Sequence, residues 1–172
     1  REARDAPNRW MLVPREIPLE EQLPERMRSV RKVEGVILSE TFLHGGAPLT
    51  VPAQTQASVL IDQGVLTTAY PELTVSGGKG AKVDLGYAET LYVRKSVDKG
   101  NRDDVEGKQF YGPADTYLAD GGPHRTYRPL FWRTYRYLQL RVKTADEPLA
   151  IEDLHGMFTA FPFQNKAGLE VG

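Results

Sequence analysis

Apolar residues occupy every second position from Ala81 through Val83 and Leu85 to Tyr87, and polar or small residues stand between them. A strand produces this period of two, because successive side chains point to opposite faces of a sheet. A helix would repeat its apolar residues every three or four positions instead. The stretch therefore predicts a strand with one buried face, and the rest of the chain has to supply the surface that covers it.

Comparable short runs, separated by turns rich in glycine and proline, fill most of the chain after residue 34. No uninterrupted helical pattern lies between them. The predicted fold class is therefore all-β, an antiparallel β-sandwich or jelly roll with an extended N-terminal strap. Besides Ala81–Ala88, the expected strands are Gly35–Ser39, Leu49–Val51, Ser58–Asp62, Pro71–Val75, Asp115–Ala119, Arg125–Phe131, Tyr135–Val142 and Leu149–Phe163.

Two of these strands carry further expectations. Pro129 is expected to confine the strand Arg125–Phe131 to a sheet edge, because proline cannot donate a backbone hydrogen bond. The strand Tyr135–Val142 is expected to have two distinct faces, since its residues alternate. Its inward residues are expected to be Leu138, Leu140 and Val142, and its outward residues Tyr137, Gln139 and Arg141.

Three segments are distinguished by composition. Residues 1–33 carry four prolines among mixed charges, and their one helix-like run, Leu19–Arg31, is interrupted by Pro24. This segment is expected to be a strap or linker. The sandwich domain is expected at residues 34–163, and an exit linker at 164–172. We expect the chain to be a piece of a larger protein.

The composition excludes several classes of function. A chain of 172 residues can bury the core of one domain without a metal or a disulfide. Its 22 Lys and Arg residues are balanced by 23 Asp and Glu residues, so the formal net charge is −1 and nucleic acid is not an expected partner. The sequence has no cysteine, and no apolar run reaches the roughly 18 residues of a membrane span.

The most site-like segment is Gly100–Lys108, which we call the charged loop. Its carboxylate and amide oxygens could bind Ca²⁺, which takes about six to eight oxygen ligands. The spacing does not match an EF-hand, and neighbouring basic residues balance the charge. A solvated loop without metal and a loop that contacts a neighbouring domain are therefore the alternatives. The oxygen-bearing residues are Asp98, Asn101, Asp103, Asp104 and Glu106.

The positions of the acidic residues and histidines in the sequence do not identify a catalytic site. Hydrolysis of a glycosidic bond requires two carboxyl groups, and Glu89 and Asp115 are candidates only by their position at strand ends. The three histidines are far apart in the sequence and lack the spacing of a zinc site. They are His44, His124 and His155.

Aromatic residues cluster between residues 127 and 137. Aromatic rings can stack on the apolar face of a sugar, and Trp132 and Tyr135 are the candidates for such stacking. The favoured alternative is packing, in which Phe131 and Trp132 fill the core or a seam between domains. The cluster comprises Tyr127, Phe131, Trp132, Tyr135 and Tyr137.

Four stretches in this order resemble a known family: LIDQGVLTTAYPELTVSGGKGAKVDLGYAETL, KGNRDDVEGK, DTYLADGG and YRPLFWRTYRYLQLRV. They are similar to the β-sandwich domain, also called concanavalin-like, of bacterial α-L-rhamnosidases of glycoside hydrolase family 78. The likeness covers about residues 10–163. The opening RWMLVPREIP is similar to the strap that enters this domain, and FPF to its exit towards the next one.

The resemblance implies that this sandwich is a non-catalytic accessory domain. Its partner would be an (α/α)6 catalytic domain of the same parent chain, an inverting glycoside hydrolase, and the location periplasmic or secreted. The exit linker would lead towards that missing domain. No catalytic residue is expected in this chain, and no cofactor. The charged loop would reach towards the catalytic domain, which makes Asn101, Arg102, Asp103 and Glu106 candidates for the interdomain contact or the substrate rim.

Two alternatives remain open at this point. The domain could be a self-sufficient carbohydrate-binding module of jelly-roll form, or a purely structural domain without ligand contact. Binding of L-rhamnose or related sugars by the fragment would distinguish the first from the second.

Overall fold

The described residues of the computed structural model, 14–94, 98–164 and 166–169, form a curled antiparallel sheet of nine strands with one short 3-10 helix. The predicted all-β class is confirmed. Within these residues, no helix is long and apolar enough to cross a membrane. The strands are β1 (Glu21–Glu25), β2 (Ser29–Glu34), β3 (Leu49–Val51), β4 (Gln56–Gly77), β5 (Lys82–Ala88), β6 (Ala114–Leu118), β7 (Arg125–Tyr127), β8 (Arg133–Lys143) and β9 (Leu149–Ala160), and the helix is η1 (Phe42–His44).

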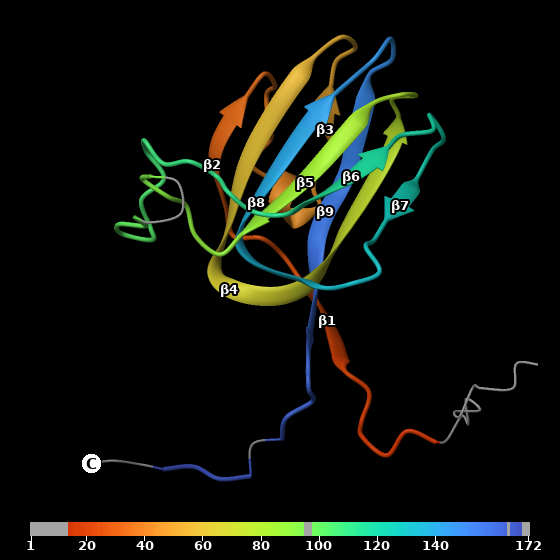
Figure 1. Cartoon of the computed structure of the whole chain (residues 1–172). Helices are drawn as coiled ribbons and strands as arrows, with labels where there is room; N and C mark the ends of the chain where they lie inside the picture. The colour runs from red at the N-terminus through yellow and green to blue at the C-terminus, as the bar shows by residue number, and fades with distance from the viewer. Residues whose placement is uncertain (1–13, 95–97, 165, 170–172) are drawn as a thin grey trace, which may run out of the picture.

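Strand β4 connects the two layers of the sandwich, because its two halves belong to different layers (Figure 1). Its first half pairs with β2 and β8, and its second half pairs with β9 and β7. The register with β8 shifts between Asp62 and Thr67, and Gly64 within this interval has a φ of 80°. A left-handed backbone conformation suits glycine, so Gly64 allows the strand to bend here.

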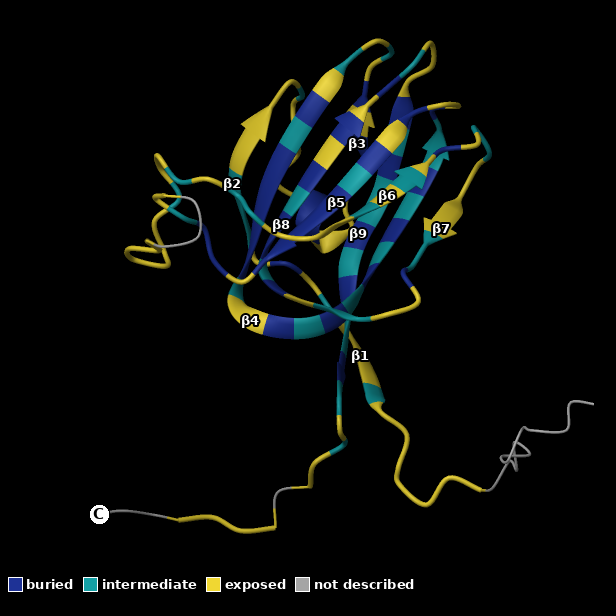
Figure 2. Ribbon diagram, viewed as in Figure 1, coloured by how far each residue is buried: buried dark blue, intermediate teal, exposed yellow. Residues whose placement is uncertain are grey.

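The first layer has the strand order β2-β4-β8-β5-β6, and the second contains β1, β3, β9, β7 and the second half of β4. Their facing sides bury the main core, visible as dark blue segments in Figure 2. Alternating residues of β5 and β8 supply much of it, as the sequence predicted. The buried residues of these two strands include Val83, Leu85, Tyr87, Leu138, Leu140 and Val142.

Several strand boundaries differ from the prediction. Gly35–Ser39 is not a strand, and the actual strand, β2, ends just before it. The predicted strands at 58–62 and 71–75 are parts of the single strand β4. The strand expected at 125–131 stops at Tyr127.

Two strands lie in the segment that was expected to be a strap. Strand β1 pairs with β9, and β2 pairs with β4, so most of residues 21–33 is built into the sheet, whereas residues 14–20 form no strand. Pro24 lies within β1, opposite Met157. Proline is accepted there because β1 is an edge strand. The predicted anchoring role of Trp10, Leu12 and Val13 lies outside the described residues.

Candidate functional site

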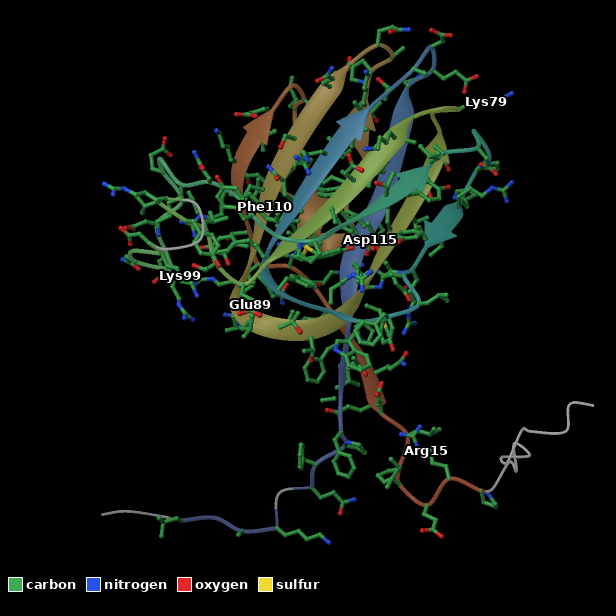
Figure 3. The ribbon with its side chains drawn as sticks, viewed as in Figure 1. Arg15, Lys79, Glu89, Lys99, Phe110 and Asp115 are labelled. Atoms are coloured by element: carbon green, nitrogen blue, oxygen red, sulfur yellow. The ribbon has the colours of Figure 1, made fainter. Side chains whose placement is uncertain are left out.

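The charged loop belongs to the long connection from β5 to β6, which folds back along the outer face of the first layer (Figures 1 and 3). Tyr92 and Gln109 close its base with two backbone hydrogen bonds, of 3.0 Å and 2.8 Å between nitrogen and oxygen. The loop therefore starts and ends at one place on the sheet. Figure 3 shows Glu89 and Lys99 on this side of the molecule, far from Lys79 at the β4–β5 turn.

A small apolar cluster lies under the loop, separate from the main core. Tyr137 and Leu60 project into it from the outer face of β8 and β4, and Val105 and Phe110 cover them from the loop side. The Phe110 ring lies over Gly86, where an added Cβ would be 2.9 Å from the ring. The missing side chain of Gly86 therefore leaves the room in which the ring lies.

Asp62 is the centre of an ion-pair network beside this cluster, and its side chain is almost fully buried. Arg136 Nε donates to Asp62 Oδ1 at 2.9 Å, and Arg31 Nη1 donates to Oδ2 at 2.8 Å. The amide of Gly64 donates to Oδ1 at 2.7 Å. A buried carboxylate is stable only with such partners, so three segments of the first layer are joined at this residue.

The network extends to the charged loop through Asp103 and Arg102. Arg136 Nη2 donates to Asp103 Oδ1 at 2.6 Å, and Arg31 Nη2 donates to the Asp103 carbonyl at 2.7 Å. The Tyr137 hydroxyl donates to the Arg102 carbonyl at 2.5 Å. These bonds hold the loop against the sheet on which it lies. The backbone of Arg102 is thus used inside the domain, although its side chain is exposed.

Electrostatics keep the network charged at neutral pH. Burial alone would raise the pKa of Asp62, but hydrogen bonds from Arg136, the Gly64 amide and Arg31 outweigh it and hold the pKa below its usual value. The hydrogen bond that Arg136 donates to Asp62 raises the pKa of Arg136. Burial, followed by the nearby Asp62 charge, raises the pKa of Tyr137, so its hydroxyl stays a proton donor. Asp62 is therefore a carboxylate and Arg136 a cation at neutral pH.

The four residues predicted for the interdomain or substrate rim play two different parts. Asp103 is drawn towards the sheet by Arg136, and Asn101 accepts a hydrogen bond from the Asp103 amide at 3.0 Å, which forms a local turn. The side chains of Arg102 and Glu106 are exposed on the surface of the loop. All four residues are exposed, but Asn101 and Asp103 use their side chains to position the loop, whereas the side chains of Arg102 and Glu106 form no such bond within the described part of the chain and are open to a partner.

The aromatic cluster is divided among different surroundings. Tyr135 is 1% exposed in the main core, so its ring has no face open to a sugar, and the stacking role predicted for it does not hold. Trp132 is half-buried and stacks on Phe131, with ring centroids 4.2 Å apart. Phe131 is 56% exposed and so lies outside the core that was one of its predicted places. Stacking of Trp132 on a sugar stays a prediction.

The structure gives the two acidic candidates different surroundings. Asp115 accepts two hydrogen bonds from Arg133, at 2.6 Å and 2.9 Å, whereas Glu89 is exposed at the end of β5 (Figure 3). Throughout the described part of the chain, His, Asp and Glu side chains nowhere gather in a group of three that could hold a metal ion. The structure thus adds nothing in favour of the Ca²⁺ alternative.

Comparison with known proteins identifies the family. The family model for the bacterial alpha-L-rhamnosidase concanavalin-like domain matches residues 53–160. The chain belongs to this family. The match extends from β4 to β9 and so includes the charged loop and most of the strands beneath it. A search of curated proteins finds no match to the sequence.

Two solved rhamnosidases contain a part with a similar fold. For the GH78 family rhamnosidase of Bacillus sp. GL1, the TM-score is 0.55 at 16% identity, and 75% of this chain and 13% of that chain are covered. For a rhamnosidase from Klebsiella oxytoca with rhamnose bound, the TM-score is 0.54 at 14% identity, and the coverage is 83% and 30%. The concanavalin-like domain therefore spans less than a third of either protein.

Sequence reasoning missed the anchor of the concanavalin-like domain, which consists of Asp62, Arg31 and Arg136. A signal was present, because Asp62 is a single acidic residue at the end of the apolar run SVLID. An acid in such a position needs a cationic partner. The identity of that partner could not be read from the sequence, since Arg136 lies 74 positions away.

Proposed function

We propose that this concanavalin-like domain is the non-catalytic sandwich of a rhamnosidase-like glycoside hydrolase, where it supports a helical catalytic domain. In this proposal, the charged loop lines the entrance to the catalytic domain. The observation that carries it is the anchoring of the loop by the buried Asp62 network, combined with the exposure of Arg102 and Glu106. A loop that is held in place before contact loses little conformational entropy on binding.

A second surface supports contact with a neighbouring domain. Apolar side chains are exposed where β4 bends and where β7 leads into β8, and the described parts of both chain ends leave the sandwich at this end (Figure 1). Exposed apolar patches are typical of contact surfaces. The most exposed residues at these two places are Val65, Leu66, Leu130 and Phe131.

The loop is tested by Arg102→Ala and Glu106→Ala in a full-length protein that contains this domain, with Lys79→Ala as the control at the opposite end. We expect KM for a rhamnoside substrate to rise in the two loop variants while the thermal stability of the protein stays unchanged. The same kinetics in the loop variants and in the control would refute a role of the loop at the entrance.

The supporting role is tested by Phe131→Asp in the same protein. A charge in an apolar contact is expected to weaken the association of the two domains, seen as separate unfolding transitions in calorimetry. Glu147→Asp, on the exposed β8–β9 turn, is the control. An unchanged unfolding profile for Phe131→Asp would contradict the proposed contact.

A further inference from the structure

Part of the outer face of the first layer is left open by the charged loop, and polar residues cross it in register. Glu34 faces Ser58, Ser58 faces Arg141, Arg141 faces Asp84, and Asp84 faces Thr116 on five adjacent strands. At the usual strand spacing of about 4.8 Å, this row is roughly 19 Å long. An extended polar ligand could therefore lie along it, across the strands.

Two adjoining hollows, each of about 430 Å³, lie over this face. The first lies over the ends of β4, β5 and β8, and the second lies between β2 and the charged loop. Both are lined by Glu34 and Ser58, so together they form one groove. Its walls are the side chains of the edge strand β2 and the loop residues around Val105 and Phe110.

The groove offers the two kinds of contact that a sugar requires. Hydroxyl groups can be bound by Ser58, Gln139 and Asp84, which combine donors and acceptors. Apolar sugar faces can pack on Val105 and Phe110, which are only partly buried at the end of the groove next to the loop. A groove with polar groups along its floor and apolar groups at one end suits an oligosaccharide better than a small inorganic anion.

The charge of the groove selects among oligosaccharides. Two of its lysines are neutralised, Lys32 by Glu34 at 2.9 Å and Lys82 by Asp84 at 2.8 Å. Arg141, Lys143 and Lys108 also line it, and none of them forms an ion pair with a carboxylate of the described residues. The Lys108 ammonium donates to the carbonyls of Lys99 and Asn101, so Arg141 and Lys143 are the two cations open to a ligand. Glu106 is a further carboxylate in the lining, but Arg141 and Lys143 still leave the groove with a net positive charge, in a chain whose net charge is −1.

We propose that this groove binds an oligosaccharide that carries carboxylate groups, such as a chain of uronic acids, with Arg141 and Lys143 as the residues that take a carboxylate. The planar guanidinium of Arg141 matches a carboxylate with two parallel hydrogen bonds. This inference goes beyond the proposed supporting role, because none of the residues that line the groove belongs to the apolar surface at the β4 bend. Glu106 lines both the groove and the proposed entrance, so the groove is tested at Arg141 and Lys143 instead.

The test is isothermal titration of the 172-residue chain with hexagalacturonate and with the methyl ester of the same oligosaccharide. The ester keeps every ring and hydroxyl but removes the charge. We expect binding of the acid, weakening at high salt, and at least about tenfold weaker binding of the ester. Equal affinity for both, or no binding of the acid, would overturn the proposal.

Charge-removing variants locate the site. Arg141→Gln and Lys143→Gln are expected to weaken binding of hexagalacturonate by about tenfold each, whereas Lys79→Gln, at the exposed β4–β5 turn, should bind like the parent chain. The basic residues substituted here and in the entrance experiment are all exposed: Lys79, Arg102, Arg141 and Lys143. Circular dichroism is therefore enough to check that these variants are folded. If all three variants bind hexagalacturonate alike, the ligand lies elsewhere and the proposal is wrong. The supporting role is tested independently, by Phe131→Asp.

Discussion

The two faces of β8 are buried in different ways. On the inner face, Leu138 and Leu140 pack against the opposite layer in the main core. On the outer face, Tyr137 is equally inaccessible, at 0% exposure, but it is covered by a loop of its own layer, while Arg141 four positions later is exposed. The alternation of residues along β8 therefore places its inner face in one continuous core. Its outer face is covered by the charged-loop connection at Tyr137 and open to solvent at Arg141.

The difference shows what each kind of burial contributes. The inner face is held by apolar area, which is non-directional and adds up over many residues. The outer cluster is small, and the loop above it is positioned by directional bonds from Asp62, Arg136 and Tyr137. We expect the inner face to determine whether the domain is folded and the outer network to determine where the charged loop lies.

The largest effect is expected on the inner face, for Leu140→Ala. Removal of a fully buried leucine side chain should lower the free energy of unfolding by about 3 kcal/mol, because it leaves a cavity in the core. Urea denaturation measures this, with the outward neighbour Gln139→Ala as control, for which we expect a change below about 0.5 kcal/mol. Similar losses for both variants would break the distinction between the two faces.

Asp62→Asn is expected to be next, with a loss of about 2 kcal/mol at neutral pH. Arg136 and Arg31 lose their shared partner, but both guanidinium groups reach solvent, which reduces the cost. The pKa of Asp62 in the folded protein is below its ordinary value of 3.8. Ionised Asp62 therefore adds to the free energy of unfolding above pH 3.8, and this stabilisation is lost as the pH falls from 3.8 towards the lower pKa of the folded state.

The difference in stability between Asp62→Asn and the parent chain should therefore shrink on acidification below about pH 4. Denaturation at a series of pH values measures it. A difference that is the same at every pH would show that Asp62 is not ionised in the anchor.

Tyr137→Phe removes only the hydroxyl that donates to the Arg102 carbonyl. The expected loss is about 1 kcal/mol, the usual worth of one such hydrogen bond. Hydrogen exchange should become faster in the charged loop and stay unchanged in β8 and β5. Faster exchange in the strands as well would mean that the loop and the core open together.

The smallest effect is expected for Arg102→Ala in this chain, below about 0.5 kcal/mol, because the side chain is exposed and the backbone carbonyl does the anchoring. A thermal melt beside Tyr137→Phe gives the comparison. A loss as large as that of Tyr137→Phe would show that the side chain itself holds the loop, and it would weaken the proposal that it faces a partner.

Most of the inner face could be predicted from the sequence, because burial there follows directly from period-two alternation. The faces of Leu138 and Tyr137 were assigned correctly, but the burial of Tyr137 was not expected, since the cover comes from residues 105 and 110 in a distant loop. Alternation tells which way a side chain points, and not what lies above it.

The edge strands and the anchor could not be predicted for a related reason. Strand β1 carries Pro24, and β2 carries Arg31 and Lys32, which are weak strand signals. Both are strands only because β9 and β4 offer them partners from far along the chain. Two partners of Asp62 likewise come from other strands, Arg31 from β2 and Arg136 from β8, so its role depends on the tertiary fold.

The continuity of β4 has a consequence for how the chain acquires its fold. This 22-residue strand pairs in its first half with β8 and in its second with β9, which ends at Ala160. During synthesis, β4 leaves the ribosome after β2 but long before β8 and β9 exist, so its first half has one free edge and its second half has two. A strand with free edges is prone to pair with other chains. High contact order of this kind slows folding. Chaperones are therefore expected to act on the nascent domain until its last strand has been made.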